Sequence, residues 1–194
     1  TSIGDANAFT LGTGAGGFND DTESFSSYCF HVAKTAEDTN NEGSIASKVI
    51  VNGSAGWSIG TWEVTEANAT IGHGLSIKPN FLLISSLDDA GEAARLGFTS
   101  LGWTKNIGFT GAIPVPYTDA TAFQDTAPTA SVFSVGSNAA LNDSGGTMFF
   151  FAAYDIAGFS TWGYTYAPTG NLDGPLAFYG FNAEFIWLMR VVGA

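Results

Sequence analysis

The sequence predicts an all-β fold, an antiparallel β-sandwich of jelly-roll-like or concanavalin-like type. Short apolar and aromatic runs are separated almost everywhere by Gly, Pro, Asn or Asp, which is typical of strands joined by turns. The densest block, Thr147–Arg190, holds three such runs, Met148–Ile156, Phe159–Tyr166 and Leu176–Met189. The first run is aromatic and lacks helical periodicity, which favours a strand over a helix. We therefore expect this block to form the core of the domain.

Shorter strands are expected elsewhere in the chain. Ile45–Asn52 and Trp57–Val64 flank the turn Gly53–Gly56 and predict a hairpin. The remaining strand candidates are apolar runs bounded by turn residues: Phe9–Gly12, Glu23–Val32, Asn80–Ile84, Phe98–Trp103, Asn106–Phe109 and Ser131–Gly136.

Five polar segments are expected to be loops, namely Thr13–Thr22, Ala33–Gly43, Thr65–Gly74, the proline-containing Gly111–Thr129 and Ser137–Gly146. Leu87–Leu96 is the only helix-like segment, and Gly91 limits it to one or two turns. Because turn-rich connections dominate, the pattern favours a sandwich over alternating β and α units.

The chain has few charged residues, and most of them are acidic. Charged residues make up 12% of the chain against 45% hydrophobic residues, and the formal net charge is −12 with six Lys and Arg. Such a chain repels phosphate backbones and anionic lipids, so we expect neither nucleic-acid binding nor membrane insertion. Neutral polar surfaces of this kind are common in secreted and assembled β-proteins. Since the sequence begins with Thr1, we expect it to be processed or part of something longer.

No residue pattern for catalysis stands out, and we expect a protein that is not an enzyme and has no cofactor. The single cysteine, Cys29, excludes an internal disulfide and suits a buried core position. Asp20-Asp21 and Asp88-Asp89 are adjacent pairs, and neighbouring residues on a strand point to opposite faces, so neither is an acid–base pair. We expect His73, which precedes Gly74-Leu75, to orient a loop by hydrogen bonding.

The sequence holds candidates for two kinds of binding site, one for calcium and one for sugar. Asn19–Asp21 and Asn171–Asp173 hold clustered oxygen ligands suited to calcium, but neither has a calcium-loop motif, and solvated turns are favoured. Trp62, Trp103 and Trp162 are candidates for stacking on sugar rings if they lie exposed. Tryptophan in the sandwich core is the favoured alternative.

The sequence also contains segments that are similar to one another. Four segments recur in the same order: Phe9–Gly12 with Phe133–Gly136, Ser27–Val32 with Phe150–Ile156, Gly56–Ile59 with Gly158–Thr161, and His73–Ile84 with Tyr179–Leu188. The pattern predicts either one β-rich domain or two packed repeats, a partial unit over 1–86 and a second unit over 87–194. Tandem β-units are typical of elongated arrays and fibres.

Four motifs carry a resemblance to a known family. They are His73-Gly74-Leu75 with Pro79–Ile84, the Asp-Thr-x-Pro-Thr segment from Asp125 to Gly136, Phe151–Ala153 leading to Gly158-Phe159-Ser160, and Asp173-Gly174-Pro175 before Gly180–Phe185. The run from Thr70 to Arg190 thereby resembles an uncharacterised β-rich repeat family of virion structural and tail-fibre proteins of tailed phages, many of them marine. Ser85 departs from its pattern, where a lysine is usual, and Ala152-Ala153 replace a Cys-Phe pair that Cys29-Phe30 keeps.

The resemblance implies a fibre, spike or capsid-decorating subunit of the virion, whose partners are other virion proteins and further copies of itself. The family brings no established active site. Two alternatives remain open, a carbohydrate-binding module for host recognition and a subunit of a cell-surface filament. Because the first repeat is incomplete, we also expect that a neighbouring subunit supplies strands missing before Phe9 and closes a bare sheet edge.

Overall fold

The computed structural model describes residues 2–5, 8–10, 37–88, 93–108, 115–142, 146–164 and 180–186. The chain separates into two compact units, Thr1–His31 and Val32–Ala194. In the first unit, β1 (Ser2–Asp5) and β2 (Ala8–Thr10) pair as an antiparallel hairpin, and β2 confirms part of the strand expected at Phe9–Gly12. The strand expected at Glu23–Val32, with Cys29, lies outside the described residues.

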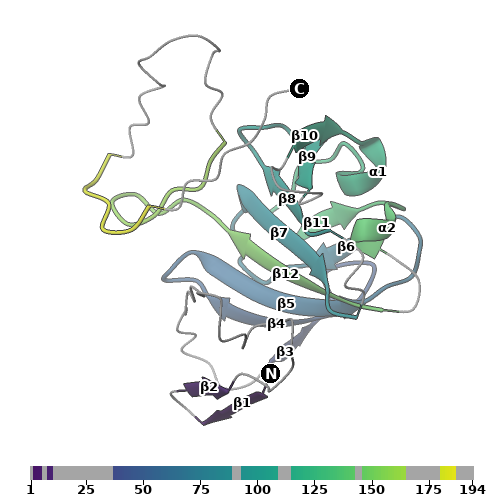
Figure 1. The fold of residues 1–194 in the computed structure, drawn as a ribbon, viewed down its shortest axis with the longest axis horizontal. Helices are drawn as coiled ribbons and strands as arrows, with labels where there is room; N and C mark the ends of the chain where they lie inside the picture. The colour runs from purple at the N-terminus through teal and green to yellow at the C-terminus, as the bar shows by residue number, and fades with distance from the viewer. Residues whose placement is uncertain are drawn as a thin grey trace, which may run out of the picture. The chain divides into compact units, whose positions relative to one another are not determined.

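The second unit is an all-β sandwich built on an eight-stranded antiparallel sheet with the order β10-β9-β8-β7-β12-β5-β4-β3 (Figure 1). Its strands are β3 (Asp38–Asn40), β4 (Ser47–Asn52), β5 (Trp57–Glu63), β7 (Phe81–Ser86), β8 (Arg95–Phe98), β9 (Lys105–Gly108), β10 (Val115–Thr118) and β12 (Thr147–Ala153).

A smaller layer covers one face of this sheet. It consists of the antiparallel pair β6 (Ala69–Gly72) and β11 (Val132–Val135), together with the short helices α1 (Ala120–Phe123) and α2 (Ala139–Asn142). We call the covered face the inner face and the opposite face the outer face. In the large sheet β7 lies between β8 and β12, so the two proposed repeats, 1–86 and 87–194, share one hydrogen-bonded layer.

The centre of the sheet is β12, the first of the three apolar runs. It pairs with β5 on one side and β7 on the other, which confirms that Met148–Ile156 begins with a buried strand. Its side chains alternate between the faces, and Met148, Phe150 and Ala152 are fully buried in the inner core.

Three aromatic rings from three strands meet in that inner core. The Phe150 ring centroid lies 5.2 Å from that of Phe133 on β11 and 6.2 Å from that of Trp62 on β5. Gly60 lies opposite Phe150 on β5, and a Cβ atom there would come within 2.6 Å of the Phe150 ring. Glycine at this position therefore makes room for the ring at the centre of the sandwich.

Several expected elements are wrong. The helix expected over Leu87–Leu96 is wrong at both ends, because residues 87–88 form a bend and β8 begins at Arg95, while residues 89–92 lie outside the described residues. The strand expected at Phe98–Trp103 is also wrong, because β8 ends at Phe98 and a turn follows it. Conversely, β3, β6 and β10 and the helices α1 and α2 lie within segments expected to be loops.

The second and third apolar runs of the C-terminal block also differ from expectation. Among their described residues, 159–164 and 180–186, the structure has bends and coil, with one isolated bridge between Ile156 and Ser160. The rest of both runs lies outside the described residues.

Candidate functional site

The outer face of the large sheet carries a continuous apolar row. Strand pairing aligns six residues from neighbouring strands, in the order Ile50, Ile59, Phe151, Leu83, Leu96 and Ile107. The first four are half-buried and the last two are buried. Both faces of this sheet are therefore hydrophobic, which differs from the usual antiparallel sheet with one solvated face.

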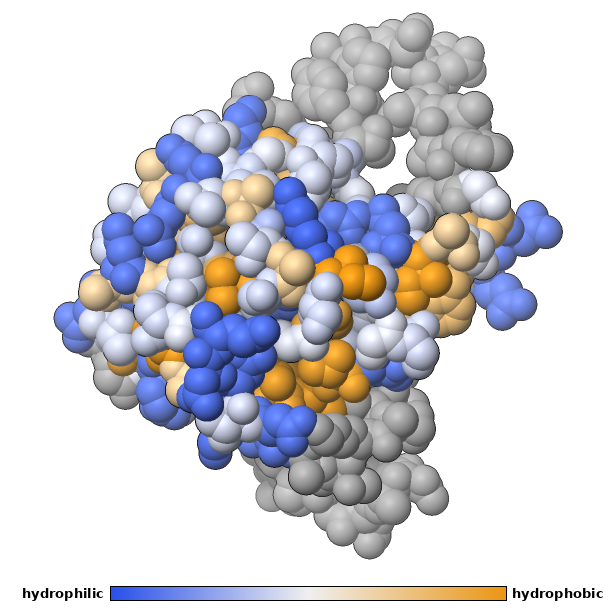
Figure 2. Space-filling view, turned by 180° about the vertical axis from the view of Figure 1, so that it is seen from behind, coloured by the Kyte–Doolittle hydropathy of each residue, from blue (hydrophilic) through white to orange (hydrophobic). Residues whose placement is uncertain are grey.

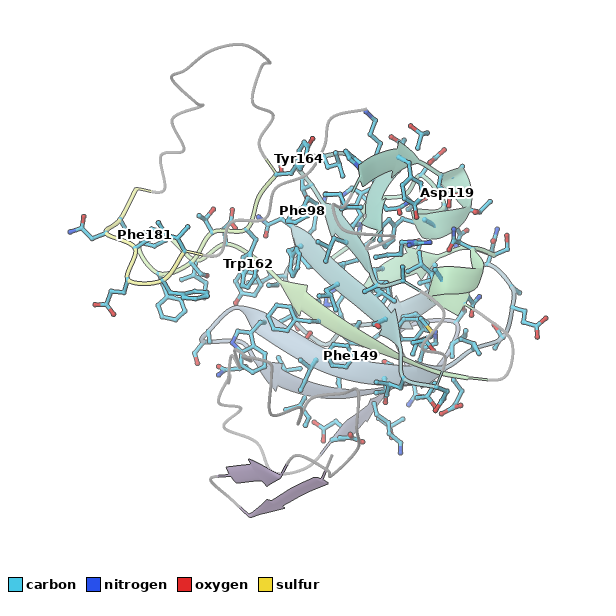
Figure 3. The ribbon with its side chains drawn as sticks, in the orientation of Figure 1. Phe98, Asp119, Phe149, Trp162, Tyr164 and Phe181 are labelled. Carbon is cyan, nitrogen blue, oxygen red and sulfur yellow. The ribbon has the colours of Figure 1, made fainter. Side chains whose placement is uncertain are left out.

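A loop after β12 packs beside the middle of this row. The Trp162 indole stacks on the Phe81 ring at a centroid distance of 4.9 Å and an interplanar angle of 13°. The Trp162 amide donates to an Asp155 carboxylate oxygen at 2.7 Å, and the Tyr164 amide donates to the Ser100 hydroxyl at 2.6 Å. In Figure 3, Trp162 lies beside the arrowhead end of β12, with Phe149 further back along the strand.

One end of the outer face is open. A shallow depression of about 150 Å³ lies there, lined by Glu37, Lys48, Ile50, Ile59, Gly60, Thr61 and Phe149. Its floor is apolar, and Lys48 and Glu37 supply one charge of each sign at its rim. An open depression of this kind suits a protein side chain better than a buried small molecule.

The three tryptophans proposed for sugar stacking lie in different environments. Trp62 is 2% exposed on the inner face, and Trp103 is 7% exposed with its ring edge-on to Phe123 at 5.3 Å. Neither offers a face to a sugar, because both pack in the core beneath β6, β11 and α1. Trp162 is half-buried, with one face occupied by Phe81.

His73 is fully buried and holds two loops together. Its Nδ1 accepts from the Leu75 amide at 3.2 Å, so its Nε2 carries the proton and donates to the Thr129 carbonyl at 3.3 Å. Burial lowers the pKa of His73, and the opposing effects of Thr129 and Glu42 only partly offset this. A neutral, fully hydrogen-bonded ring fits the loop-orienting role that the sequence predicts.

A polar cluster at the far edge of the sheet was not anticipated from the sequence. The buried Arg95 guanidinium lies 5.4 Å above the Tyr117 ring, a cation–π geometry, and donates to the Ala93 carbonyl at 3.3 Å. Fully buried Asn106 lies beside Tyr117 in the strand register. The sequence offered one signal, a lone arginine at the start of the short apolar segment Arg95–Phe98.

Asp119 joins this cluster to α1. Its Oδ1 accepts from the Thr121 amide at 2.9 Å, and its Oδ2 accepts from the Asn138 amide group at 2.5 Å. Burial alone would raise the pKa of Asp119, but these hydrogen bonds and the Arg95 charge outweigh it and hold the pKa below its usual value. The carboxylate therefore serves as a helix cap.

We expect Asp119→Ala to lower the free energy of unfolding by about 1 kcal/mol, the usual cost of losing an N-cap. Urea denaturation followed by far-UV circular dichroism measures it. Asp119→Asn keeps the capping oxygen and should lose less than half as much. Equal stability of the native chain and the alanine variant would contradict the capping role.

Within the described residues, no group of three or more His, Cys, Asp or Glu side chains is placed to hold a metal ion. The calcium candidates Asn19–Asp21 and Asn171–Asp173 lie outside those residues. None of the helices that the structure describes has the length and apolarity to cross a bilayer.

Comparison with known proteins gives one finding. Neither a curated protein nor a solved structure matches the chain. Residues 2–193 match a family model described as a domain of unknown function, DUF7483. This match covers nearly the whole sequence, and the chain therefore belongs to the DUF7483 family.

Proposed function

We propose that the chain is a structural subunit of a tailed-phage virion, a fibre, spike or capsid-decorating protein that acts by assembly. The observation that carries the proposal is the half-buried part of the apolar row on the outer face, Ile50, Ile59, Phe151 and Leu83, on a sheet whose inner face is already packed. The row belongs to a second core cluster that buries Leu96 and Ile107. Apolar side chains that stay partly exposed beside such a cluster are characteristic of protein–protein contact. The sequence resemblance to virion proteins supports the same assignment.

Exposed apolar side chains add to this support. Phe159, Phe185 and Ile186 are 62%, 61% and 54% exposed, well above the usual exposure of such residues. Seen from behind, hydrophobic residues form several patches among hydrophilic ones (Figure 2). Contact with other subunits would bury these side chains.

Locating the protein in intact particles tests the proposal. We expect mass spectrometry to find the chain in purified virions, and antibody labelling in electron microscopy to mark a repeated position on each particle. Recovery of the chain from cell-envelope fractions and not from virions would favour the surface-filament alternative instead.

A glycan array addresses the carbohydrate-binding alternative. With Trp62 and Trp103 in the core, Trp162 is the remaining tryptophan of the three proposed, and we expect no sugar to bind. Binding that is lost in Trp162→Ala and kept in the exposed-residue control Phe159→Ala would support a host-recognition module.

A further inference from the structure

We propose that a second copy of the chain binds at the open depression on the outer face, about a two-fold axis that places Lys48 of each copy against Glu37 of the other. This inference rests on the proposed assembly role and names the contact that would produce it. It combines the open shape of the depression, its apolar floor and the two opposite charges at its rim.

The depression is built from two cross-strand rows of the outer face. Ile50 on β4 lies opposite Ile59 on β5, and this pair forms the first row. In the second row, Thr61 on β5 lies between Lys48 on β4 and Phe149 on β12. Because residues two positions apart on a strand point to the same face, the two rows form one continuous surface.

Glu37 borders this surface beside β3, the edge strand of the sheet. Thr39 lies opposite Lys48 in the register of β3 and β4, and continuing that register by two residues brings Glu37 to Ile50. Glu37 and Lys48 are exposed, whereas Ile50, like the rest of the apolar floor, is half-buried. An acidic and a basic side chain therefore flank one apolar floor.

A patch with one charge of each sign is complementary to its own copy. A two-fold axis makes every contact occur twice, so a pair between Lys48 of one copy and Glu37 of the other implies the reverse pair as well. A lysine side chain has an apolar stem and a charged end. Lys48 therefore fits a depression with an apolar floor and a carboxylate at its rim.

The net charge of the chain favours contact at this place. Two copies that each carry a formal net charge of −12 repel one another. The charges that line the depression, one positive and one negative, sum to zero. Approach at the depression therefore meets less repulsion than approach through acidic surface.

Charge reversal tests the contact. Lys48→Glu and Glu37→Lys each place two like charges opposite one another at both ends of the dimer interface. We expect the native chain to form dimers with rising concentration in analytical ultracentrifugation. Each reversal should weaken dimer formation by about tenfold or more, since two exposed ion pairs become repulsive.

Mixing the two reversed chains separates a contact between copies from one within a single chain. In a mixed dimer of Lys48→Glu with Glu37→Lys, each reversed charge meets its opposite across the interface. We expect mixed dimers to form as readily as native dimers, while each variant alone stays mostly monomeric. Native mass spectrometry with one of the two chains isotopically labelled identifies the mixed dimer. An ion pair within one chain would not be restored by mixing.

Lys78→Glu is the matched control for the reversal of Lys48. Lys78 is exposed in the loop between β6 and β7 and does not line the depression, and its reversal changes the net charge by the same amount. This variant should dimerise like the native chain. Each variant must also reproduce the far-UV circular dichroism of the native chain. If one reversed chain misfolds, the double variant Lys48→Glu/Glu37→Lys replaces it, and we expect that variant to dimerise like the native chain.

The two proposals fail separately. A native chain that stays monomeric at every concentration would overturn the two-fold contact, and so would folded reversed chains that stay monomeric when mixed. Association that neither Lys48→Glu nor Glu37→Lys weakens contradicts this contact and leaves the assembly role in place. Absence of the chain from purified virions contradicts the virion assignment, whatever the state of the chain in solution.

Discussion

Replacing Phe150 with alanine is expected to lower the free energy of unfolding by about 3–5 kcal/mol. The ring is 0% exposed and lies where β12, β5 and β11 meet, in contact with Trp62 and Phe133. Its removal leaves a cavity that neighbouring strands cannot fill, because both flanks of β12 are held by continuous hydrogen-bonded ladders. Urea denaturation, followed by tryptophan fluorescence and by far-UV circular dichroism, measures the loss.

The neighbouring residue provides the control. Phe149 is the same side chain on the same strand, but it points to the outer face and borders the open depression. Phe149→Ala should cost about 1 kcal/mol, in proportion to the smaller apolar area that it removes from water. Equal losses in the two variants would contradict the assignment of inner and outer faces.

Elements with strong local patterns were the predictable part of the fold. The β4–β5 hairpin and β7 were expected within two residues of their bounds, because each combines apolar side chains with flanking turn residues. The centre of β12 was equally predictable, because an aromatic run without helical periodicity indicates a strand. These strands supply the all-β class of the protein.

Elements that depend on distant partners were not predictable. β6 reads ATIG and looks like loop sequence, yet Ile71 is fully buried because β11 pairs with it and the inner core covers it. The four-residue helix α1 exists through the Asp119 cap and the burial of Phe123, neither of which gives a periodic signal. Tertiary packing decides such short segments.

The site is predictable to a similar extent. The hydrogen-bonding role of His73 was expected from its position before Gly74-Leu75, whereas its partner Thr129 is 56 residues away. Trp62 could face either way, since a strand places alternate residues on opposite faces and only the register decides which face is inner. The outer apolar row becomes visible only when six strands are aligned.

His73→Ala is the second large change that we expect, at about 2–5 kcal/mol of unfolding free energy. The substitution leaves a cavity at a fully buried position and removes the partners of the Leu75 amide and the Thr129 carbonyl. Each buried polar group without a partner costs about 1–3 kcal/mol. Urea denaturation at pH 7.5 gives the size of the effect.

The pH dependence separates the imidazole from a general packing defect. Burial holds the pKa of His73 in the folded state below 6.5, so the unfolded chain binds the proton more readily. The stabilisation is therefore complete above pH 6.5 and is lost as the pH falls toward the folded-state pKa. The free energy of unfolding of the native chain should fall as the pH decreases over this range. The free energy of unfolding of His73→Ala should lack this part of the decrease.

Phe150→Ala is the matched control for this measurement, since it destabilises the fold to a similar degree and keeps the imidazole. Carboxylates titrate at lower pH in all three proteins, so the difference between the native and His73→Ala profiles isolates the histidine. We expect the Phe150→Ala profile to run parallel to that of the native chain. If His73→Ala also ran parallel, the ring would be titrating freely, and the buried, neutral His73 linking two loops would be ruled out.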